Sequence, residues 1–188
     1  MITVPEQVVA ARAAALAAQF PYSSDDVVGR LLSVLAAAVP SGGRILELGT
    51  GAGVGLAWLI HGLGRRTDVE VITVESVPAQ AALAGNQSWP DFVTLLHDDA
   101  VSVLPSLGQF DLIFADAPGG KWDRLDLTVE ALRPGGFLLV DDMTPEEWWE
   151  EEQREKQRQV SQALLSHAGL VSIEMEWSTG VILCVRKH

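Results

Sequence analysis

The chain of 188 residues has a single cysteine, few basic residues and no long hydrophobic run. With only Cys184 present, neither an intrachain disulfide nor a zinc site built on several cysteines can form. Cys184 lies in the apolar run 181–185 and is expected to be a small buried side chain. No apolar run reaches the ~18 residues of a membrane span, and the N-terminus lacks the basic segment of a secretory signal. We therefore expect a soluble, cytoplasmic protein with no membrane partner.

Basic side chains are scarce, since 13 Lys and Arg residues stand against 25 Asp and Glu residues and the formal net charge is −12. The basic residues cluster only at 65–66 and 186–188. Binding to a phosphate backbone needs clustered lysines and arginines. Nucleic acid is therefore not expected as a partner, and a small molecule is the expected substrate.

The composition is that of a folded protein, with 48% hydrophobic and 20% charged residues. This length suits a single domain that needs no disulfide or metal to fold. We expect one domain over residues 1–188. It comprises N-terminal helices (1–40), a cofactor-binding core (44–142) and a C-terminal part (143–188) with a charged helix and a closing hairpin.

Short apolar runs rich in Val, Ile and Leu alternate with segments that suit helices. Strands are expected at 44–48, 69–74, 92–96, 110–115 and 136–140. Helices are expected at 5–19, 24–39 (capped by Ser23 or Ser24), 54–63, 78–87, 100–107 and 123–132. Strand and helix thus repeat every 20–25 residues or so, which is typical of βαβ units. The expected fold class is α/β, a doubly wound, mostly parallel sheet with helices on both faces.

The C-terminal part departs from this alternation. A strongly charged helix is expected over 145–167, followed by two apolar runs at 170–176 and 180–186. Residues 178–180, Ser-Thr-Gly, can form a turn between these runs. They therefore predict an antiparallel hairpin that closes the sheet.

A glycine-rich segment follows the first expected strand and opens a helix, with the sequence E-L-G-T-G-A-G-V-G over residues 47–55. Glycines there allow a sharp turn and a close approach of a ligand to the backbone. The dinucleotide pattern G-x-G-x-x-G fails from Gly49, because Val54 takes its last position. The pattern also fails when it is counted from Gly51, because Leu56 then stands at the position of the last glycine. A nicotinamide oxidoreductase is therefore disfavoured.

Carboxylates recur where the expected strands end. Glu75 ends the second strand, Asp98 and Asp99 follow the third, Asp116 ends the fourth, and Asp141 and Asp142 follow the fifth. The carboxyl ends of parallel strands meet at one edge of a sheet, which is where ligands bind in open α/β folds. Any one of these acids can be a helix cap or a turn residue. Together with the glycine loop they indicate a ligand site.

These motifs resemble class I S-adenosylmethionine (SAM)-dependent methyltransferases, and in particular the small O-methyltransferases of the catechol and caffeoyl-coenzyme A type. The resemblance covers about residues 22–142. It implies a Rossmann-like seven-stranded sheet whose last strand is antiparallel. It also implies that Glu75 holds the ribose, that Asp99 faces the adenine, and that residues 22–24 close over the cofactor. The implied cofactor-binding residues are Ser24, Glu47, Gly49, Thr50, Gly51, Gly53, Glu75, Asp98, Asp99, Ala100 and Asp116.

The resemblance further implies a divalent ion, usually Mg²⁺, held by Asp116, Asp141 and Asp142. Carboxylates are ligands that such an ion prefers, and it would lower the pKa of an acceptor hydroxyl. Metal-dependent relatives usually carry Asp-Asn where this chain has Asp141-Asp142. They also carry a lysine two or three residues after the fourth-strand aspartate, whereas Lys121 follows Asp116 by five.

Asp116 and Lys121 are the expected catalytic residues. Lys121 can act as a base or steer an anionic acceptor, or it can be a solvated lysine at a helix start. No Asn/Asp-Pro-Pro-Tyr/Phe motif follows the fourth strand, which favours oxygen as the methyl acceptor.

Six tryptophans are many for a chain of this length. Trp58 is expected in the core and Trp89 to pack in a loop. Trp122, Trp148 and Trp149 can form an aromatic wall for a planar acceptor, or an interface patch.

The main hypothesis is a SAM-dependent methyltransferase acting on an oxygen of a small molecule. A SAM-binding protein without catalytic activity is one alternative. An aminopropyltransferase is another, disfavoured because such enzymes carry an N-terminal β domain where this chain begins with helices. By analogy with related enzymes, the alanine-rich N-terminal helix can form a homodimer contact.

Overall fold

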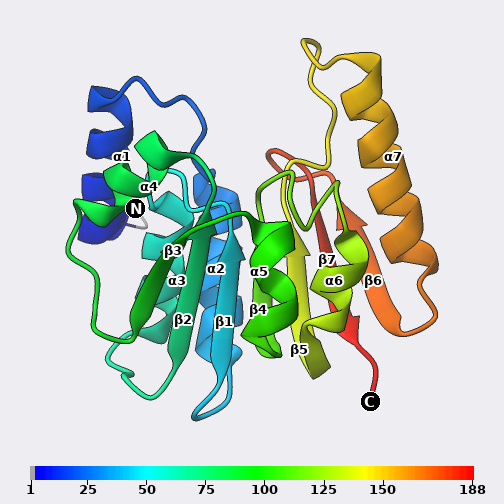
Figure 1. Ribbon diagram of the computed structural model, residues 1–188, viewed down its shortest axis with the longest axis horizontal. Coiled ribbons are helices and arrows are strands. Elements are labelled where there is room, and N and C mark those ends of the chain that lie inside the picture. Colours follow the sequence, from blue (N-terminus) through cyan, green and yellow to red (C-terminus); the bar gives the residue numbers. More distant parts are fainter. Residues whose placement is uncertain (1–2) are drawn as a thin grey trace.

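Seven strands form one sheet in the order β3-β2-β1-β4-β5-β7-β6 in the computed structural model, which describes residues 3–188 (Figure 1). The strands β1 to β5 pair in parallel, and β7 is antiparallel to both of its neighbours. Their bounds are β1 Arg44–Leu48, β2 Glu70–Glu75, β3 Val93–His97, β4 Phe110–Ala115, β5 Leu132–Val140, β6 Leu170–Met175 and β7 Val181–Arg186. The expected fold class, including the antiparallel last strand, is confirmed.

Helices cover both faces of this sheet (Figure 1). The helices α1 to α3 pack into one hydrophobic core, and α5 to α7 pack into a second core on the opposite face. The helix bounds are α1 Glu6–Ala17, α2 Asp26–Ala38, α3 Val54–Leu63, α4 Pro78–Gly85, α5 Ala100–Leu107, α6 Leu125–Glu130 and α7 Glu151–Ser166.

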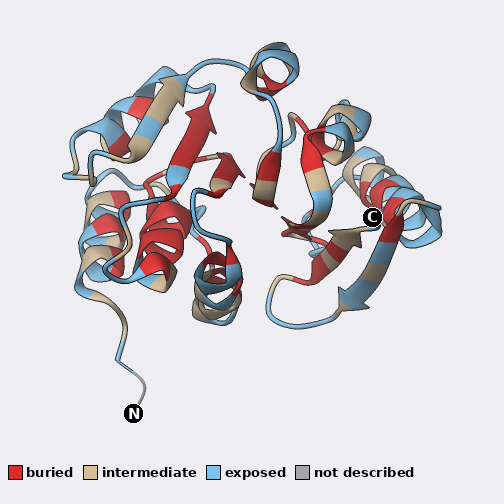
Figure 2. Ribbon diagram, turned by 90° about the horizontal axis from the view of Figure 1, so that it is seen from below, coloured by how far each residue is buried: buried red, intermediate tan, exposed pale blue. Residues whose placement is uncertain are grey.

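The central strands β1 and β4 are buried from both sides, which explains their continuous apolar sequences (Figure 2). Trp58 of α3 is fully buried in the first core, as expected. Cys184 of β7 is buried in the second, and burial raises the pKa of its thiol. It is therefore a small core side chain, as expected.

Several boundaries differ from those expected. The cap of α2 is Asp25, whose carboxylate accepts a hydrogen bond from the backbone of Val27 at 2.7 Å, and not Ser23 or Ser24. Strand β5 begins at Leu132 because it continues past a register shift opposite Phe110 and Leu112, which also shortens α6. A loop precedes α7, which begins only at Glu151. The predicted hairpin is present as β6 and β7.

The chain reverses its direction across the sheet between β3 and β4. From β1 the chain adds β2 and β3 on one side, and it then crosses back to place β4 and β5 on the other. The loops after β1 and β4 therefore diverge and open a crevice at the carboxyl ends of these strands. This topology puts the glycine loop and the strand-end carboxylates around one opening.

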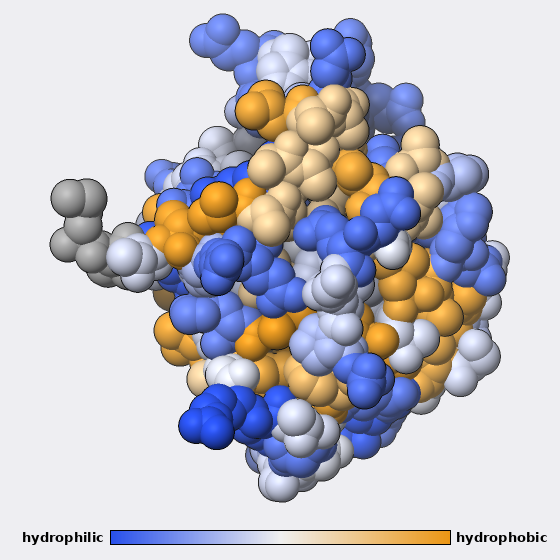
Figure 3. Space-filling view, turned by 90° about the vertical axis from the view of Figure 1, so that its left-hand side faces the viewer, coloured by the Kyte–Doolittle hydropathy of each residue, from blue (hydrophilic) through white to orange (hydrophobic). Residues whose placement is uncertain are grey.

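On its outer side the molecule alternates hydrophobic and hydrophilic patches, as the view toward α1 and α4 shows (Figure 3). Among the large hydrophobic residues of α1, Val9 and Leu16 are exposed. Within residues 3–188, none of the helices combines the length and the apolar character needed to cross a bilayer.

Candidate cofactor and acceptor site

The glycine loop passes very close to the end of β4. Gly49 has φ +97°, and a Cβ atom there would lie 2.7 Å from the backbone oxygen of Asp116. The backbone N–H of Gly51 donates to a carboxylate oxygen of Glu75 at 2.8 Å. The other oxygen of Glu75 accepts from Val77 N at 2.9 Å. Because only glycine fits at position 49, the sequence fixes the close approach of β1 and β4 on which the site depends.

A cavity of about 590 Å³ opens above this loop. Its walls include the segment 20–24, the glycine loop, the end of β2, the segment 116–122, the end of β5 with the loop that follows, Gln80 of α4, Gln153 of α7 and Thr179. A second cavity of about 260 Å³ adjoins it and contains Asp98, Asp99 and Ala100. Gly49 and Glu75 line both cavities, so together they form one elongated site.

Most of the cofactor-binding residues implied by the resemblance lie in these two cavities. Ser24, Gly49, Thr50, Gly51, Glu75 and Asp116 line the larger cavity, and Asp98, Asp99 and Ala100 line the smaller. Asp99 also caps α5, because its Oδ2 accepts from the backbone N of Ser102 at 3.1 Å and from its hydroxyl at 2.8 Å. One oxygen of Asp99 is therefore engaged in holding the helix.

Glu47 and Gly53 do not line either cavity. Glu47 is buried beneath the loop, where its Oε2 accepts from the hydroxyl of Thr73 at 2.5 Å. Burial raises the pKa of Glu47 to about 8. Gly53 has φ +84°, and a Cβ atom there would lie 2.6 Å from the ring of Trp89. Both residues therefore support the glycine loop from the side that faces away from the cavities.

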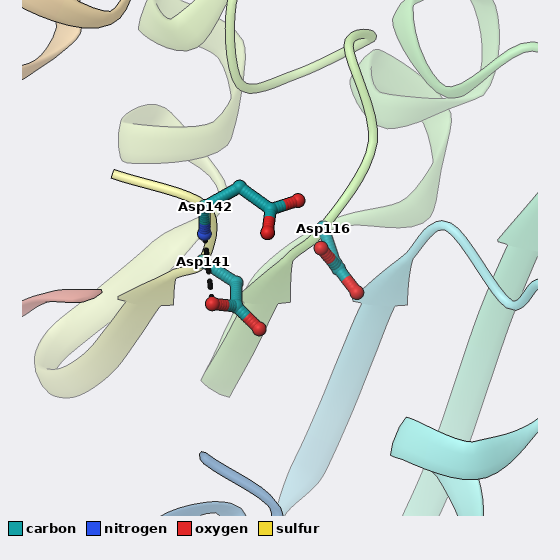
Figure 4. Close-up of side chains that lie close together, drawn as sticks. All are labelled: Asp116, Asp141 and Asp142. Carbon is teal, nitrogen blue, oxygen red and sulfur yellow. Dashed lines mark hydrogen bonds between the residues drawn. The ribbon is translucent and has the colours of Figure 1, made fainter. Parts of the chain in front are cut away.

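Asp116, Asp141 and Asp142 turn their carboxylates toward one another at the ends of β4 and β5 (Figure 4). One oxygen atom from each lies within 4.8 Å of the others. Asp142 has φ +56°, in the left-handed region, and its N–H donates to Asp141 Oδ1 at 2.7 Å. The hydroxyl of Thr179, in the turn between β6 and β7, donates to the same oxygen.

Burial and mutual repulsion shift the titration of this group of acids. The pKa of Asp116 is raised well above its ordinary value, by burial first and then by the charge of Asp141. The pKa of Asp141 is raised to about 6, by burial first and then by the charge of Asp142. The negative charges of the three carboxylates repel one another, and a divalent cation between them would offset that repulsion. Carboxylate oxygens are also ligands that Mg²⁺ prefers, so this donor set fits Mg²⁺.

Lys121 is buried in the larger cavity, so the alternative of a solvated lysine is wrong. Its Nζ donates to the backbone oxygen of Asp141 at 3.2 Å and lies 3.7 Å from Asp142 Oδ2. The turn before it directs the chain inward, since Gly120 has φ +83° and a Cβ atom there would meet Leu48 at 2.6 Å. This turn brings Lys121 back to the site despite its unusual spacing from Asp116.

Three of the tryptophans, Trp122, Trp148 and Trp149, line the larger cavity. Trp149 packs edge-to-face against both other rings, with centroid distances of 5.8 Å to Trp122 and 6.2 Å to Trp148. These three residues form what we call the tryptophan wall. Trp89 packs instead against the loop as expected, and its indole N–H donates to the backbone of Ala84 at 2.9 Å.

Other residues of the cavity carry no signal in the sequence. Phe20 lies against Gly51, whose added Cβ atom would be 3.0 Å from its ring. Thr179 reaches Asp141 from the turn between β6 and β7, 38 residues further along the chain. Glu146 and Gln153 enter the cavity from a stretch that resembles a solvated charged surface. Only the folded sheet brings these segments to the site.

The site has the features of an α/β domain that binds a nucleoside-containing cofactor. These are a glycine loop, a carboxylate at the end of β2, and two joined cavities where the strand order reverses. The family model described as a methyltransferase domain matches residues 46–143. The chain belongs to this methyltransferase-domain family, as the resemblance predicted.

Known proteins agree with this assignment. A protein named as an O-methyltransferase from Mycobacteroides abscessus is 37% identical over 120 residues, which are 60% of this chain and 55% of that protein. The chain spans about half the length of the curated relatives it matches. Cofactor-bound Rv0187 from MTB is 26% identical, with a TM-score of 0.81 over 100% of this chain and 93% of that one. The O-methyltransferase TomG from Streptomyces achromogenes shares the fold at 22% identity, with a TM-score of 0.81 over 100% and 92%.

Proposed function

We propose that this protein transfers a methyl group from SAM to an oxygen atom of a small-molecule acceptor. The observation that carries the proposal is one cavity that joins the Gly51–Glu75 pair to the acids at the ends of β4 and β5. Relatives named as O-methyltransferases and the TomG structure, described as a complex with SAM, support the same assignment.

The cofactor site would be formed by the glycine loop and the two strand ends beside it. The carboxylate of Glu75, fixed by Gly51 and Val77, is suited to accept hydrogen bonds from ribose hydroxyls. The smaller cavity, with Asp98 and Asp99, would take the adenine. SAM supplies a methyl group on a positively charged sulfur, which is the electrophile of the reaction. The carboxylate of Asp116, in the larger cavity, lies where it can face this charge.

The acceptor would lie in the rest of the larger cavity, between the three acids and the tryptophan wall. Asp116, Asp141 and Asp142 would hold a divalent ion, which lowers the pKa of an acceptor hydroxyl. Lys121, buried beside Asp142, can stabilise the resulting oxyanion as an ammonium group, and it would accept the proton of that hydroxyl only in its neutral form. The walls hold acceptor and cofactor in line and exclude water, and such alignment contributes much of the rate of a displacement.

Calorimetry and a product assay test this proposal. We expect SAM to bind with micromolar affinity and NAD not to bind, and we expect S-adenosylhomocysteine to form when a vicinal diphenol is added. Glu75→Gln should weaken SAM binding at least tenfold, because the side-chain amide cannot accept from both backbone donors. Glu70→Gln, at the exposed start of the same strand, is the matched control and should bind SAM as the unchanged protein does.

Two results would contradict the proposal. Absence of SAM binding would refute the cofactor assignment. SAM binding without product from any acceptor would favour the alternative of a binding protein that lacks catalysis. If SAM binds and turnover does not respond to Mg²⁺, methyl transfer proceeds without a metal.

A further inference from the structure

The tryptophan wall is held in place by α7. The guanidinium group of Arg154 donates to the backbone oxygens of Glu146, of Glu147 at 3.2 Å and of Trp149 at 3.1 Å. Glu150 and Gln153 form a capping box at the start of the same helix. These contacts fix the loop 146–149 over the cavity, so its side chains form a defined surface for a ligand.

This surface carries one carboxylate beside its aromatic rings. Glu146 Oε2 accepts a hydrogen bond from the indole Nε1 of Trp148 at 2.6 Å. Trp148 is half exposed, so the pair lies at the outer rim of the cavity. The faces of tryptophan rings attract cations, and a carboxylate beside them adds to that attraction.

The rest of the cavity offers little to an anionic ligand. Among the described residues that line it, Lys121 is the single cation. Its ammonium group already faces Asp142 and the backbone oxygen of Asp141. Carboxylates are more numerous in the same lining: Glu75, Asp116, Asp141, Asp142 and Glu146. Arg154 lies nearby, but its donors are directed at backbone oxygens of the loop.

We propose that Glu146 is a specificity-determining residue, which selects aromatic acceptors whose remote end is positively charged and rejects those that carry a carboxylate or phosphate there. This inference rests on the proposed function, because it assigns the acceptor of that same site. The ring of the acceptor lies against the tryptophan wall, its hydroxyl faces the three acids, and its charged substituent extends to Glu146.

The experiment compares three vicinal diphenols that differ only in the substituent opposite the hydroxyls: 2-aminoethyl, ethyl and 2-carboxyethyl. Each is titrated by calorimetry into protein saturated with S-adenosylhomocysteine. We expect the cation to bind most tightly and the anion at least tenfold more weakly than the cation.

Two isosteric variants test the residue itself. Glu146→Gln keeps an acceptor for Trp148 and removes the charge, so the preference for the cation over the neutral compound should fall about threefold to fivefold. Glu147→Gln removes the same charge from the next residue, which is exposed and does not line the cavity. It should leave the preference within twofold of that of the unchanged protein.

Equal affinities for the three compounds, tightest binding of the anion, or no binding by any of them would overturn the assignment of Glu146. An equal loss of preference in both variants would overturn it too, because the effect would then come from overall charge. A failure of the proposed function gives a different result from a failure of the Glu146 assignment. If the charge ranking holds while no S-adenosylhomocysteine forms from SAM, methyl transfer is refuted and the charge selection by Glu146 stands.

Discussion

At the scale of one residue, Glu47 shows how a buried acidic side chain can support a site from beneath without lining its cavities. It lies under the glycine loop, where Thr73 donates to it and shares a hydrogen bond of 2.6 Å with Thr50. Its Oε1 atom is buried and has no hydrogen-bond partner among the described residues. Thr50 lines the larger cavity, so this chain of contacts connects the buried carboxyl group to the surface of the site.

The raised pKa of Glu47 makes the stability of the fold depend on pH. Below pH 4.5 its carboxyl group is protonated in both the folded and the unfolded chain, and burial costs nothing extra. As the pH rises from 4.5 to about 8, the unfolded chain releases this proton and the folded chain retains it, so the free energy of unfolding falls. When the pH is raised from 5 to 8.5, we expect the free energy of unfolding of the unchanged protein to fall by about 3–4 kcal/mol relative to that of Glu47→Gln.

Urea-induced unfolding at several pH values measures this difference. Glu174→Gln on the exposed edge strand β6 is the control, and its stability should follow that of the unchanged protein. If Glu47→Gln and the unchanged protein change in parallel with pH, Glu47 does not titrate as its burial predicts.

The glycine loop decides the geometry of the site at the scale of an element. Gly49 adopts φ +97° because β1 must turn away from β4 while the two backbones nearly touch. The turn 118–120 plays a similar role on the other side of the crevice, because it directs Lys121 back into the cavity. In both places the absence of a side chain permits a close approach that no other residue allows.

Gly49→Ala should therefore disrupt the site and the fold together. The added methyl group would require the backbone of Asp116 to move, and we expect a loss of about 1–3 kcal/mol in stability together with the loss of SAM binding. Chemical denaturation and calorimetry measure the two effects. Gly85→Ala, where an added Cβ atom meets nothing within 4 Å, is the control and should stabilise the fold by about 0.5–1 kcal/mol. A fully stable Gly49→Ala variant that binds SAM would contradict this account.

On the scale of the whole molecule, the switch in strand order concentrates acidic groups on one edge of an already acidic protein. The net charge is −12, and three acids of that edge lie within 4.8 Å of one another. Lys121 faces Asp142 and offsets part of their repulsion. A divalent cation bound there would offset the rest, and any ligand that binds only the folded state stabilises it.

Mg²⁺ should therefore raise the melting temperature. At ten times its dissociation constant a single site contributes about 1.4 kcal/mol, which corresponds to a shift of about 3–6 °C for a chain of this size. Thermal unfolding with MgCl₂, compared with NaCl at equal ionic strength, measures this. Asp142→Ala should lose the shift and Asp91→Ala, on the exposed surface, should keep it. An equal shift with NaCl, or in Asp142→Ala, would show general screening and no site.

Much of the fold was predictable because its signals are local. Runs of Val, Ile and Leu predicted β1 to β4 within about one residue, and the predicted bounds of α3 and α5 matched fully. The boundaries that failed depend on tertiary contacts. Asp25 caps α2 instead of Ser23 or Ser24, and Ser24 lines the cavity. Strand β5 starts early because it pairs past a register shift.

The sequence by itself determined the α/β class, the glycine loop and the placement of an acid at the ends of β2 to β5, because each follows from short-range backbone geometry and from alternation along the chain. Only the tertiary structure decided that Lys121 is buried beside Asp142, that Thr179 holds Asp141, and that Glu146 shares a cavity with the tryptophan wall. Those side chains come from segments far apart in the chain. Their meeting depends on the strand order and on the packing of α7, neither of which a local pattern records.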